Sequence, residues 1–177
     1  MKKINIEITR ALQVGPPSSV VLVTSISKNG QPNIITLGMY MPISINPPLI
    51  TIGVSSKRFS HHLIMETGEF VVNIPPKRLA KTTDLCGTIS GRETDKFKET
   101  KLTPISAEKV QPPLIKECMA HLECKVVVTY EIGDHTLFVG EIVHATVNSN
   151  LYKDSFDVLK AQPLLYKSGF YYGLISI

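Results

Sequence analysis

Residues 20–36 read VVLVTSISKNGQPNIIT, and this stretch decides the fold class. Its first seven residues are mostly apolar and β-branched, which indicates a buried strand over residues 20–26. Asn29 and Gly30 follow, and Asn-Gly between two such runs is the strongest short-range signal for a β-hairpin. The partner strand is predicted to begin near Pro32, which is tolerated there because it opens the strand, and to run through Thr36.

More strands are predicted directly after this hairpin. Residues 38–44 read as a bend that enters an extended piece. Residues 49–54 and 69–74 are short apolar runs rich in β-branched side chains, bounded by prolines or glycines. These runs predict strands that alternate with turns.

The second half of the chain predicts a long hairpin. Residues 121–128 alternate between polar and apolar side chains, which is typical of an antiparallel strand with one exposed face. A turn at residues 133–135 leads into a long strand over residues 136–147. Gly140 within that strand indicates a bulge or a close approach of the backbone.

The predicted architecture is mainly β. About six or seven hairpin-linked strands and no alternation of strands with long helices argue against a doubly wound parallel sheet. A closed antiparallel barrel with short peripheral helices is the economical solution, because closure removes exposed strand edges. Since no repeat or linker interrupts the sequence, residues 1–177 are expected to form one domain.

Two short helices are predicted between the strands. One begins near Phe59, with a serine at its start as the cap, and ends before Gly68. A second helix is predicted over residues 77–85. Residues 87–118 read as irregular, and an irregular stretch of this length is usually functional or folds over a ligand or a partner.

Composition excludes several classes of protein. The net charge is +4, without the dense Lys/Arg stripe of a nucleic-acid-binding protein. Cys86, Cys118 and Cys124 cannot all pair within one chain and show no metal-ligand spacing, so we expect reduced thiols and no metal site. Without a signal peptide or an apolar run long enough to span a membrane, a cytoplasmic location is expected.

The sequence Ser55-Ser56-Lys57-Arg58-Phe59-Ser60 carries the strongest local signal of a binding site. It lies where a predicted strand ends and a helix begins, and a helix N-terminus presents unpaired N–H groups and positive potential. Hydroxyls and cations placed there would complete a phosphate site. The alternative is that one serine only caps the helix while Lys57 and Arg58 are solvated.

Residues 33–44, NIITLGMYMPIS, form a second candidate. They mix polar side chains, a glycine, and apolar sulfur and aromatic groups. An isoalloxazine ring needs this mixture, because its edge takes hydrogen bonds and its faces take apolar contact. The alternative is that Met39, Tyr40 and Met41 are core or interface residues.

An ordered set of motifs resembles the flavin reductase-like family, in the branch of flavoredoxins and archaeal ferric reductases. The motifs are the NxxTxG segment at 33–38, Pro47-Pro48-Leu49, the S-x-K-R-x-S stretch at 55–60, Gly68-Glu69-Phe70-Val71-Val72-Asn73, Asp95-Lys96-Phe97, Leu122-Glu123-Cys124, Gly133-Asp134-His135 and Phe138-Val139-Gly140-Glu141. The resemblance implies an antiparallel Greek-key split β-barrel. It also implies a homodimer with FMN, rather than FAD, near the subunit interface.

By motif position, the resemblance implies a set of flavin-binding residues. Those expected beside the ring and the ribityl chain are Asn33, Thr36, Leu37, Gly38, Met39 and Tyr40, and those expected at the phosphate are Ser55, Lys57, Arg58 and Ser60. Ser90 and Lys96 are expected to contact the flavin from the same or the partner subunit. His135 is expected near the flavin or the nicotinamide, the alternative being a turn histidine that bonds only Asp134 or solvent. Cys86 and Cys118 are expected to be buried structural thiols.

The resemblance implies an oxidoreductase. The main hypothesis is an NAD(P)H-dependent flavin or ferric reductase that passes electrons to a flavin, a ferric chelate or a partner protein. The second is an electron carrier of the flavoredoxin type with tightly held FMN, and the third is a split barrel that binds pyridoxal phosphate or haem. Because no GxGxxG fingerprint occurs, a nicotinamide is expected to bind folded or stacked over the flavin.

Overall fold

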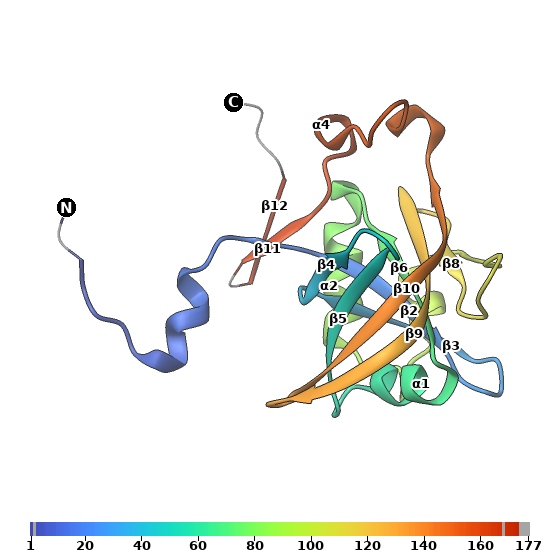
Figure 1. The fold of residues 1–177 in the computed structure, drawn as a ribbon, viewed down its shortest axis with the longest axis horizontal. Coiled ribbons are helices and arrows are strands. Elements are labelled where there is room, and N and C mark those ends of the chain that lie inside the picture. Colours follow the sequence, from blue (N-terminus) through green and yellow to red (C-terminus); the bar gives the residue numbers. More distant parts are fainter. Residues whose placement is uncertain (2, 168, 174–177) are drawn as a thin grey trace.

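One antiparallel sheet organises the molecule (Figure 1). The computed structural model describes residues 1, 3–167 and 169–173, and within them this sheet has seven strands. They are β2 (Val21–Ile26), β3 (Pro32–Leu37), β4 (Tyr40–Ser44), β5 (Leu49–Ser55), β6 (Glu69–Ile74), β9 (Ala120–Ile132) and β10 (His135–Val147). The order across the sheet is β3-β2-β6-β9-β10-β5-β4.

The sheet is a barrel with a split. Its end strands β3 and β4 are neighbours in sequence, but within the described chain they do not pair with each other. Figure 1 shows that the sheet is curled, and it encloses a cluster of buried hydrophobic side chains. The predicted mainly β, antiparallel split-barrel architecture is therefore confirmed.

Helices and two small sheets surround the barrel. The helices are α1 (Phe59–Thr67), α2 (Ala80–Thr88), α3 (Lys96–Thr100) and α4 (Val158–Ala161), with 3₁₀ turns η1 (Ile8–Val14), η2 (Lys77–Leu79) and η3 (Ser149–Leu151). The small sheets join β1 (Ser18–Ser19) to β11 (Leu165–Lys167) and β12 (Phe170–Tyr172), and β7 (Pro104–Ile105) to β8 (Leu114–Ile115). None of the helices in the described residues is long and apolar enough to cross a membrane.

The first hairpin forms where the sequence predicts it. Strands β2 and β3 pair from Val21 opposite Leu37 to Ile26 opposite Pro32. Gly30 closes the turn with a φ of +80°, a conformation that favours glycine. The strands predicted at 49–54 and 69–74 are also present, as β5 and β6.

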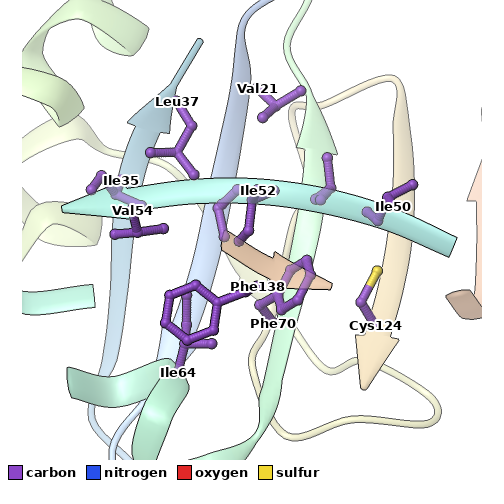
Figure 2. Close-up of a cluster of buried hydrophobic side chains, with 12 residues drawn as sticks. Val21, Ile35, Leu37, Ile50, Ile52, Val54, Ile64, Phe70, Cys124 and Phe138 are labelled. Atoms are coloured by element: carbon purple, nitrogen blue, oxygen red, sulfur yellow. The ribbon is translucent and has the colours of Figure 1, made fainter. Parts of the chain in front are cut away.

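The core lies between the two halves of the curled sheet (Figure 2). Phe70 of β6 and Phe138 of β10 are fully buried at its centre. Gly140 makes this packing possible, because a Cβ there would lie 2.6 Å from the ring of Phe70. The ladder between β9 and β10 also shifts register at Gly140, so both the bulge and the close approach predicted there are confirmed.

Helix α1 confirms the predicted helix but corrects its cap. Gly68 ends it in the left-handed conformation, with a φ of +68°. No serine caps its start, because Arg58 occupies the N-cap position without a side-chain cap bond. Ser60 instead lies buried in the first turn, where its hydroxyl meets strand β3.

Residues 87–118 are more ordered than predicted. Helix α2 continues to Thr88, past the predicted end at residue 85, and the segment also contains α3, β7 and β8. The loop from β7 to β8 crosses the outer face of β6 and β9. Thr24 donates to the carbonyl of Pro113 at 2.6 Å, and Asn73 accepts from the N–H of Ile115 at 2.8 Å.

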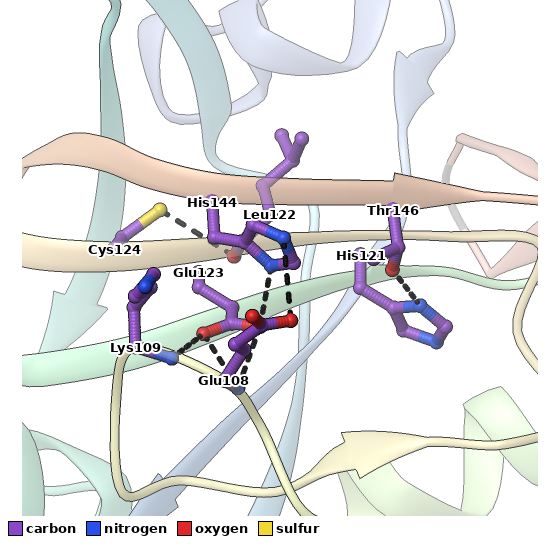
Figure 3. Close-up of polar contacts among 8 residues, drawn as sticks. All are labelled: Glu108, Lys109, His121, Leu122, Glu123, Cys124, His144 and Thr146. Carbon is purple, nitrogen blue, oxygen red and sulfur yellow. Dashed lines mark hydrogen bonds and ion pairs between the residues drawn. The ribbon is translucent and has the colours of Figure 1, made fainter.

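This loop overturns the prediction that β9 has an exposed polar face. His121 is 8% exposed and Glu123 is 1% exposed, because residues 107–115 cover them. Glu123 accepts hydrogen bonds from the N–H groups of Glu108 and Lys109, the shortest at 2.6 Å, and from His144 Nδ1 at 3.0 Å (Figure 3). Alternation predicts which side chains share a face, but it does not predict that a distant loop covers that face.

Candidate functional site

A large cavity lies at the split of the barrel. It has a volume of about 550 Å³. Ile35, Leu37 and Met39 supply apolar walls, and Gly53 and Ser55 of β5 face them. The other lining residues are Leu12, Gln13, Gly15, Pro16, Ser18, Thr36, Gly38, Arg58, Gly87, His135, Tyr166 and Lys167. An apolar cavity of this size with a few polar groups is typical of a small-molecule site.

A smaller polar hollow of about 90 Å³ adjoins this cavity and shares Ile35, Arg58 and Gly87 with it. Lys57, Arg58, Arg92 and Lys96 line the hollow, together with the hydroxyls of Ser60 and Ser90. In the part of the chain that the structure describes, no carboxylate lines the hollow or forms an ion pair with these cations. The arrangement is suited to an anion with several oxygens.

Helix α1 begins at the wall of the hollow, where Phe59 and Ser60 line it. The first turn of a helix presents N–H groups without intrahelical partners and the positive end of the helix dipole. Both add to the positive potential of the cations around the hollow. The site therefore combines a helix start with side chains from two distant loops.

Asn33 fixes the floor of the hollow. Its side-chain amide is buried and donates to Ser60 Oγ at 2.8 Å. Gly91 lies against the same amide so closely that a Cβ at Gly91 would come 2.0 Å from Asn33 Oδ1. The glycine is thus needed for the loop to reach the strand.

Lys96 is a buried cation in the wall of the hollow. Its ammonium group donates to the carbonyl oxygen of Cys86 at 2.6 Å. Burial lowers the pKa of Lys96 to about 8, and the positive charge of Arg58 acts in the same direction. An anion bound beside Lys96 would restore its charge, because it offsets the cost of burial.

His135 opens strand β10 and lines the large cavity. Its Nδ1 lies 2.7 Å from the Asp134 carboxylate, and this hydrogen bond lowers the pKa of Asp134. The bond to Asp134 is what we expected of a histidine that only stabilises the turn. The position in the cavity is what we expected of a histidine that contacts the flavin. The contact of His135 with a flavin or a nicotinamide stays a prediction.

The predicted residues fall into two adjacent groups. The large cavity brings together Thr36, Leu37, Gly38, Met39, Ser55, Arg58 and His135. The polar hollow brings together Asn33, Lys57, Arg58, Ser60, Ser90 and Lys96. Tyr40 lines neither space, since it packs against the barrel core, and burial raises the pKa of its hydroxyl.

Sequence reasoning missed Arg92 and Gly87. Arg92 stacks over the ring of Phe59, 5.4 Å from its centre, and donates to the carbonyl of Lys57 at 3.1 Å. Gly87 borders both spaces, and a Cβ there would meet Thr36 at 3.3 Å. Both residues lie in or beside the stretch that lacks periodicity, so no local pattern marked them.

The cysteine thiols are not expected to take part in the chemistry of the site. Cys86, Cys118 and Cys124 are free and buried. Burial raises the pKa of the Cys86 thiol to about 11 and raises those of the other two further, which keeps all three protonated. Within the described residues, no group of three or more His, Cys, Asp or Glu side chains is placed to hold a metal ion.

Comparison with known proteins agrees with this geometry. Residues 15–174 match the flavin reductase like domain. The chain belongs to the flavin reductase-like family. An uncharacterized protein from Archaeoglobus fulgidus is 42% identical over 139 residues, which cover 78% of this chain and 76% of the relative.

Several relatives have functional names, among them a flavoredoxin and an FAD reductase. The flavoredoxin from Methanosarcina acetivorans is 31% identical, with a TM-score of 0.89 over 100% of this chain and 94% of that one. The NADH-dependent FAD reductase from Streptomyces globisporus is 30% identical over 131 residues, which cover 73% of this chain and 70% of the relative. These relatives support a redox function that uses a flavin.

Proposed function

We propose that this protein binds FMN and acts as an NAD(P)H-dependent flavin or ferric reductase. The observation that carries the proposal is the polar hollow. Its four basic side chains have no carboxylate partner within the described chain, and it opens onto the apolar cavity. A phosphorylated aromatic ligand would fit this site, with its phosphate in the polar hollow and its ring in the apolar cavity.

The residues present fit a flavin mononucleotide. Lys57, Arg58, Ser60, Ser90 and Lys96 would hold the phosphate, with Arg92 added to the predicted set. Thr36, Leu37, Gly38, Met39 and Ser55 would hold the ribityl chain and the ring. FMN is favoured over FAD because a hollow of about 90 Å³ has the size for one terminal phosphate.

The roles of the protein are binding, orientation and exclusion of water. The bound flavin would accept a hydride from a reduced nicotinamide and pass electrons onward. Met39 covers Gly53, where a Cβ would come 2.9 Å from the Met39 sulfur, so the apolar wall is closely packed. Asp134 holds the ring of His135 at the rim of the cavity by accepting a hydrogen bond from Nδ1, so the other ring nitrogen, Nε2, can accept a hydrogen bond from a bound nicotinamide or flavin.

The structural likeness to the Methanosarcina acetivorans flavoredoxin supports a second candidate, an electron carrier with tightly held FMN. A carrier would retain its flavin through dialysis and would not oxidise NAD(P)H. A reductase would turn over NAD(P)H rapidly. The two candidates share the binding site and differ in whether a nicotinamide reaches it.

A homodimer is part of the proposal, and an apolar sheet face supports it. One row of side chains crosses four neighbouring strands on the same face of the sheet. The row consists of Met41 on β4, Thr51 on β5, Val139 on β10 and Val128 on β9, each paired with the next. We call this row, with its exposed neighbours Met39, Tyr130 and Ile132, the apolar sheet face. It adjoins the large cavity through Met39.

The N-terminal arm is exposed as well, although Leu12 lines the large cavity and its carbonyl accepts a hydrogen bond from Lys167 Nζ at 2.7 Å. Turn η1 contains no buried residue, and Ile8, Leu12 and Val14 are exposed. Figure 1 shows the arm extending away from the barrel. Exposed apolar surface of this extent marks an interaction site, and a second copy of the chain would cover it.

The visible spectrum of the purified protein tests the function directly. Flavin bands are expected, followed by bleaching when NADH or NADPH is added without oxygen. Flavin bands without bleaching would favour the carrier. A colourless protein that does not take up added FMN would contradict both candidates, and a Soret band would indicate haem.

A further inference from the structure

A third hollow, of about 250 Å³, opens beside the large cavity. It shares Thr36, Gly38, Gly87 and Tyr166 with that cavity. It shares Gly87 and Thr88 with the polar hollow, and the residues that line only the third hollow are Val20, Asp84 and Tyr171. The third hollow and the large cavity are therefore adjacent, close enough for one extended ligand to contact both.

The third hollow has an aromatic wall and a carboxylate. The rings of Tyr166 and Tyr171 contact each other, with centres 5.3 Å apart and planes at 58°. The hydroxyl of Tyr171 donates to Asp84 Oδ1 at 3.2 Å, and Asp84 and burial together raise the pKa of Tyr171 to about 12. Among the described residues, Asp84 Oδ2 has no hydrogen-bond or ion-pair partner.

The charges on the two sides of Gly87 are opposite. The polar hollow carries four basic side chains, whereas no lysine or arginine of the described chain lines the third hollow. A phosphate group is therefore favoured in the polar hollow and disfavoured beside Asp84. Neutral hydroxyl or amino groups would suit the Asp84 carboxylate as hydrogen-bond donors.

We propose that the third hollow binds the adenosine half of a reduced nicotinamide dinucleotide and that Asp84 selects NADH over NADPH. The proposal rests on the proposed reductase function. Tyr166 and Tyr171 would contact the adenine, and Asp84 would accept hydrogen bonds from the ribose hydroxyls. A carboxylate on the adenosine ribose favours NADH, because the 2′-phosphate of NADPH would be repelled.

The size of the hollow agrees with half of a dinucleotide. Whole small-molecule sites usually occupy about 300–1,000 Å³, and this hollow has about 250 Å³. The other half of the ligand would lie in the large cavity, where the nicotinamide must meet the flavin. Lys167 lines the large cavity next to the shared Tyr166 and would offer a positive charge to the pyrophosphate.

The test measures kcat/KM for NADH and for NADPH with the FMN-loaded protein. The wild type is expected to prefer NADH about tenfold or more. Asp84→Asn is expected to reduce this preference at least fivefold, because it removes the repelling charge and keeps the side-chain shape. Tyr171→Phe is the matched control, since it removes the contact to Asp84 but keeps the carboxylate, and it should keep the preference for NADH.

A binding measurement separates this inference from the proposed function. Calorimetry with 5′-AMP and 2′,5′-ADP requires no turnover, and the wild type should bind 5′-AMP more tightly. An equal ratio of the two affinities in wild type and Asp84→Asn would overturn the role of Asp84. Selective binding of 5′-AMP without any oxidation of NAD(P)H would instead overturn the reductase proposal and leave the nucleotide site standing.

Discussion

The side-chain amide of Asn33 donates a 2.8 Å hydrogen bond to Ser60 Oγ, which joins strand β3 to the first turn of helix α1. Asn33 comes from the segment proposed to hold the flavin ring, and Ser60 comes from the segment proposed to hold its phosphate. This contact fixes the two segments relative to each other. The position of the proposed phosphate site is thus set by the barrel itself.

Replacing Lys57 and Arg58 together by alanine should weaken FMN binding by about 2–4 kcal/mol, the range for two charge-assisted contacts. Fluorescence titration with FMN and with riboflavin measures the effect. Riboflavin has no phosphate, so its affinity should be about the same for the variant and the wild type. Lys98→Ala with Lys101→Ala, on and after helix α3, is the control for a loss of two positive charges. An equal loss for riboflavin would contradict the phosphate assignment.

The affinity for FMN should fall as the pH rises through about 8. Below this pH Lys96 is protonated and attracts the phosphate, and above it the ammonium charge is lost. The ligand-free protein should respond in the opposite sense. The pKa of Lys96 is about 8 in the fold and has an ordinary value of 10.5, so the cost of burying its charge disappears between these values and stability increases.

Lys96→Gln is the reference for both measurements. Titration with FMN and urea unfolding, each between pH 7 and 10.5, should show flatter profiles for Lys96→Gln than for the wild type. Identical profiles for the two proteins would show that Lys96 neither contacts the phosphate nor titrates in this range.

Glu123→Ala should destabilise the fold by about 3–5 kcal/mol, the usual cost of breaking a buried charged network. The change leaves the N–H groups of Glu108 and Lys109 without an acceptor and removes the buried one of the two carboxylate partners of His144, since the other partner is Glu108. Urea unfolding at pH 7 measures the loss. Glu131→Ala, at an exposed position on the same strand, should change the stability by less than about 0.5 kcal/mol.

The contribution of Glu123 should depend on pH in a definite direction. Burial acts to raise its pKa, but the N–H groups of Glu108 and Lys109 and the side chain of His144 together hold the pKa below its ordinary value of 4.5. The stabilisation is therefore present above about pH 4.5 and is lost as the pH falls through the lower value in the fold. A difference between wild type and Glu123→Ala that does not shrink in acid would refute this account.

Met41→Lys should convert the proposed dimer to a monomer. The change places a charge at the β4 end of the apolar sheet face, where Met41 is 56% exposed in the single chain. Light scattering during size-exclusion chromatography gives the molar mass. Met65→Lys, at a similarly exposed position on helix α1, should leave the dimer intact. A wild type that is monomeric would refute the dimer itself.

Local patterns predicted the elements well where one short stretch contains the whole signal. The hairpin around Gly30, helix α1 with Gly68 at its end and the bulge at Gly140 are all of this kind. The cations Lys57 and Arg58 were also found, because they directly precede a helix. Each of these features is determined by residues that are adjacent in the sequence, so a local sequence pattern is enough to predict it.

Features made by distant segments were not predictable in the same way. Nothing around Arg92 indicates that its side chain reaches Phe59 and the polar hollow. The alternation around Glu123 predicts an exposed face, which the distant loop at Glu108 covers. Tyr40 was predicted to contact the ligand, but it packs against the barrel core and lines neither the large cavity nor the polar hollow.

The split between β3 and β4 has a consequence for how this protein can change. Leu37 and Met39 lie beside the edges of β3 and β4, which form no hydrogen bonds with each other. The large cavity therefore results from the order of the strands and not from the loss of a bulky side chain. Point substitutions along the edges of β3 and β4 can change which ligand binds in the cavity. Closing the large cavity would require the main chains of β3 and β4 to form a new row of hydrogen bonds, and no single amino-acid substitution produces such a row.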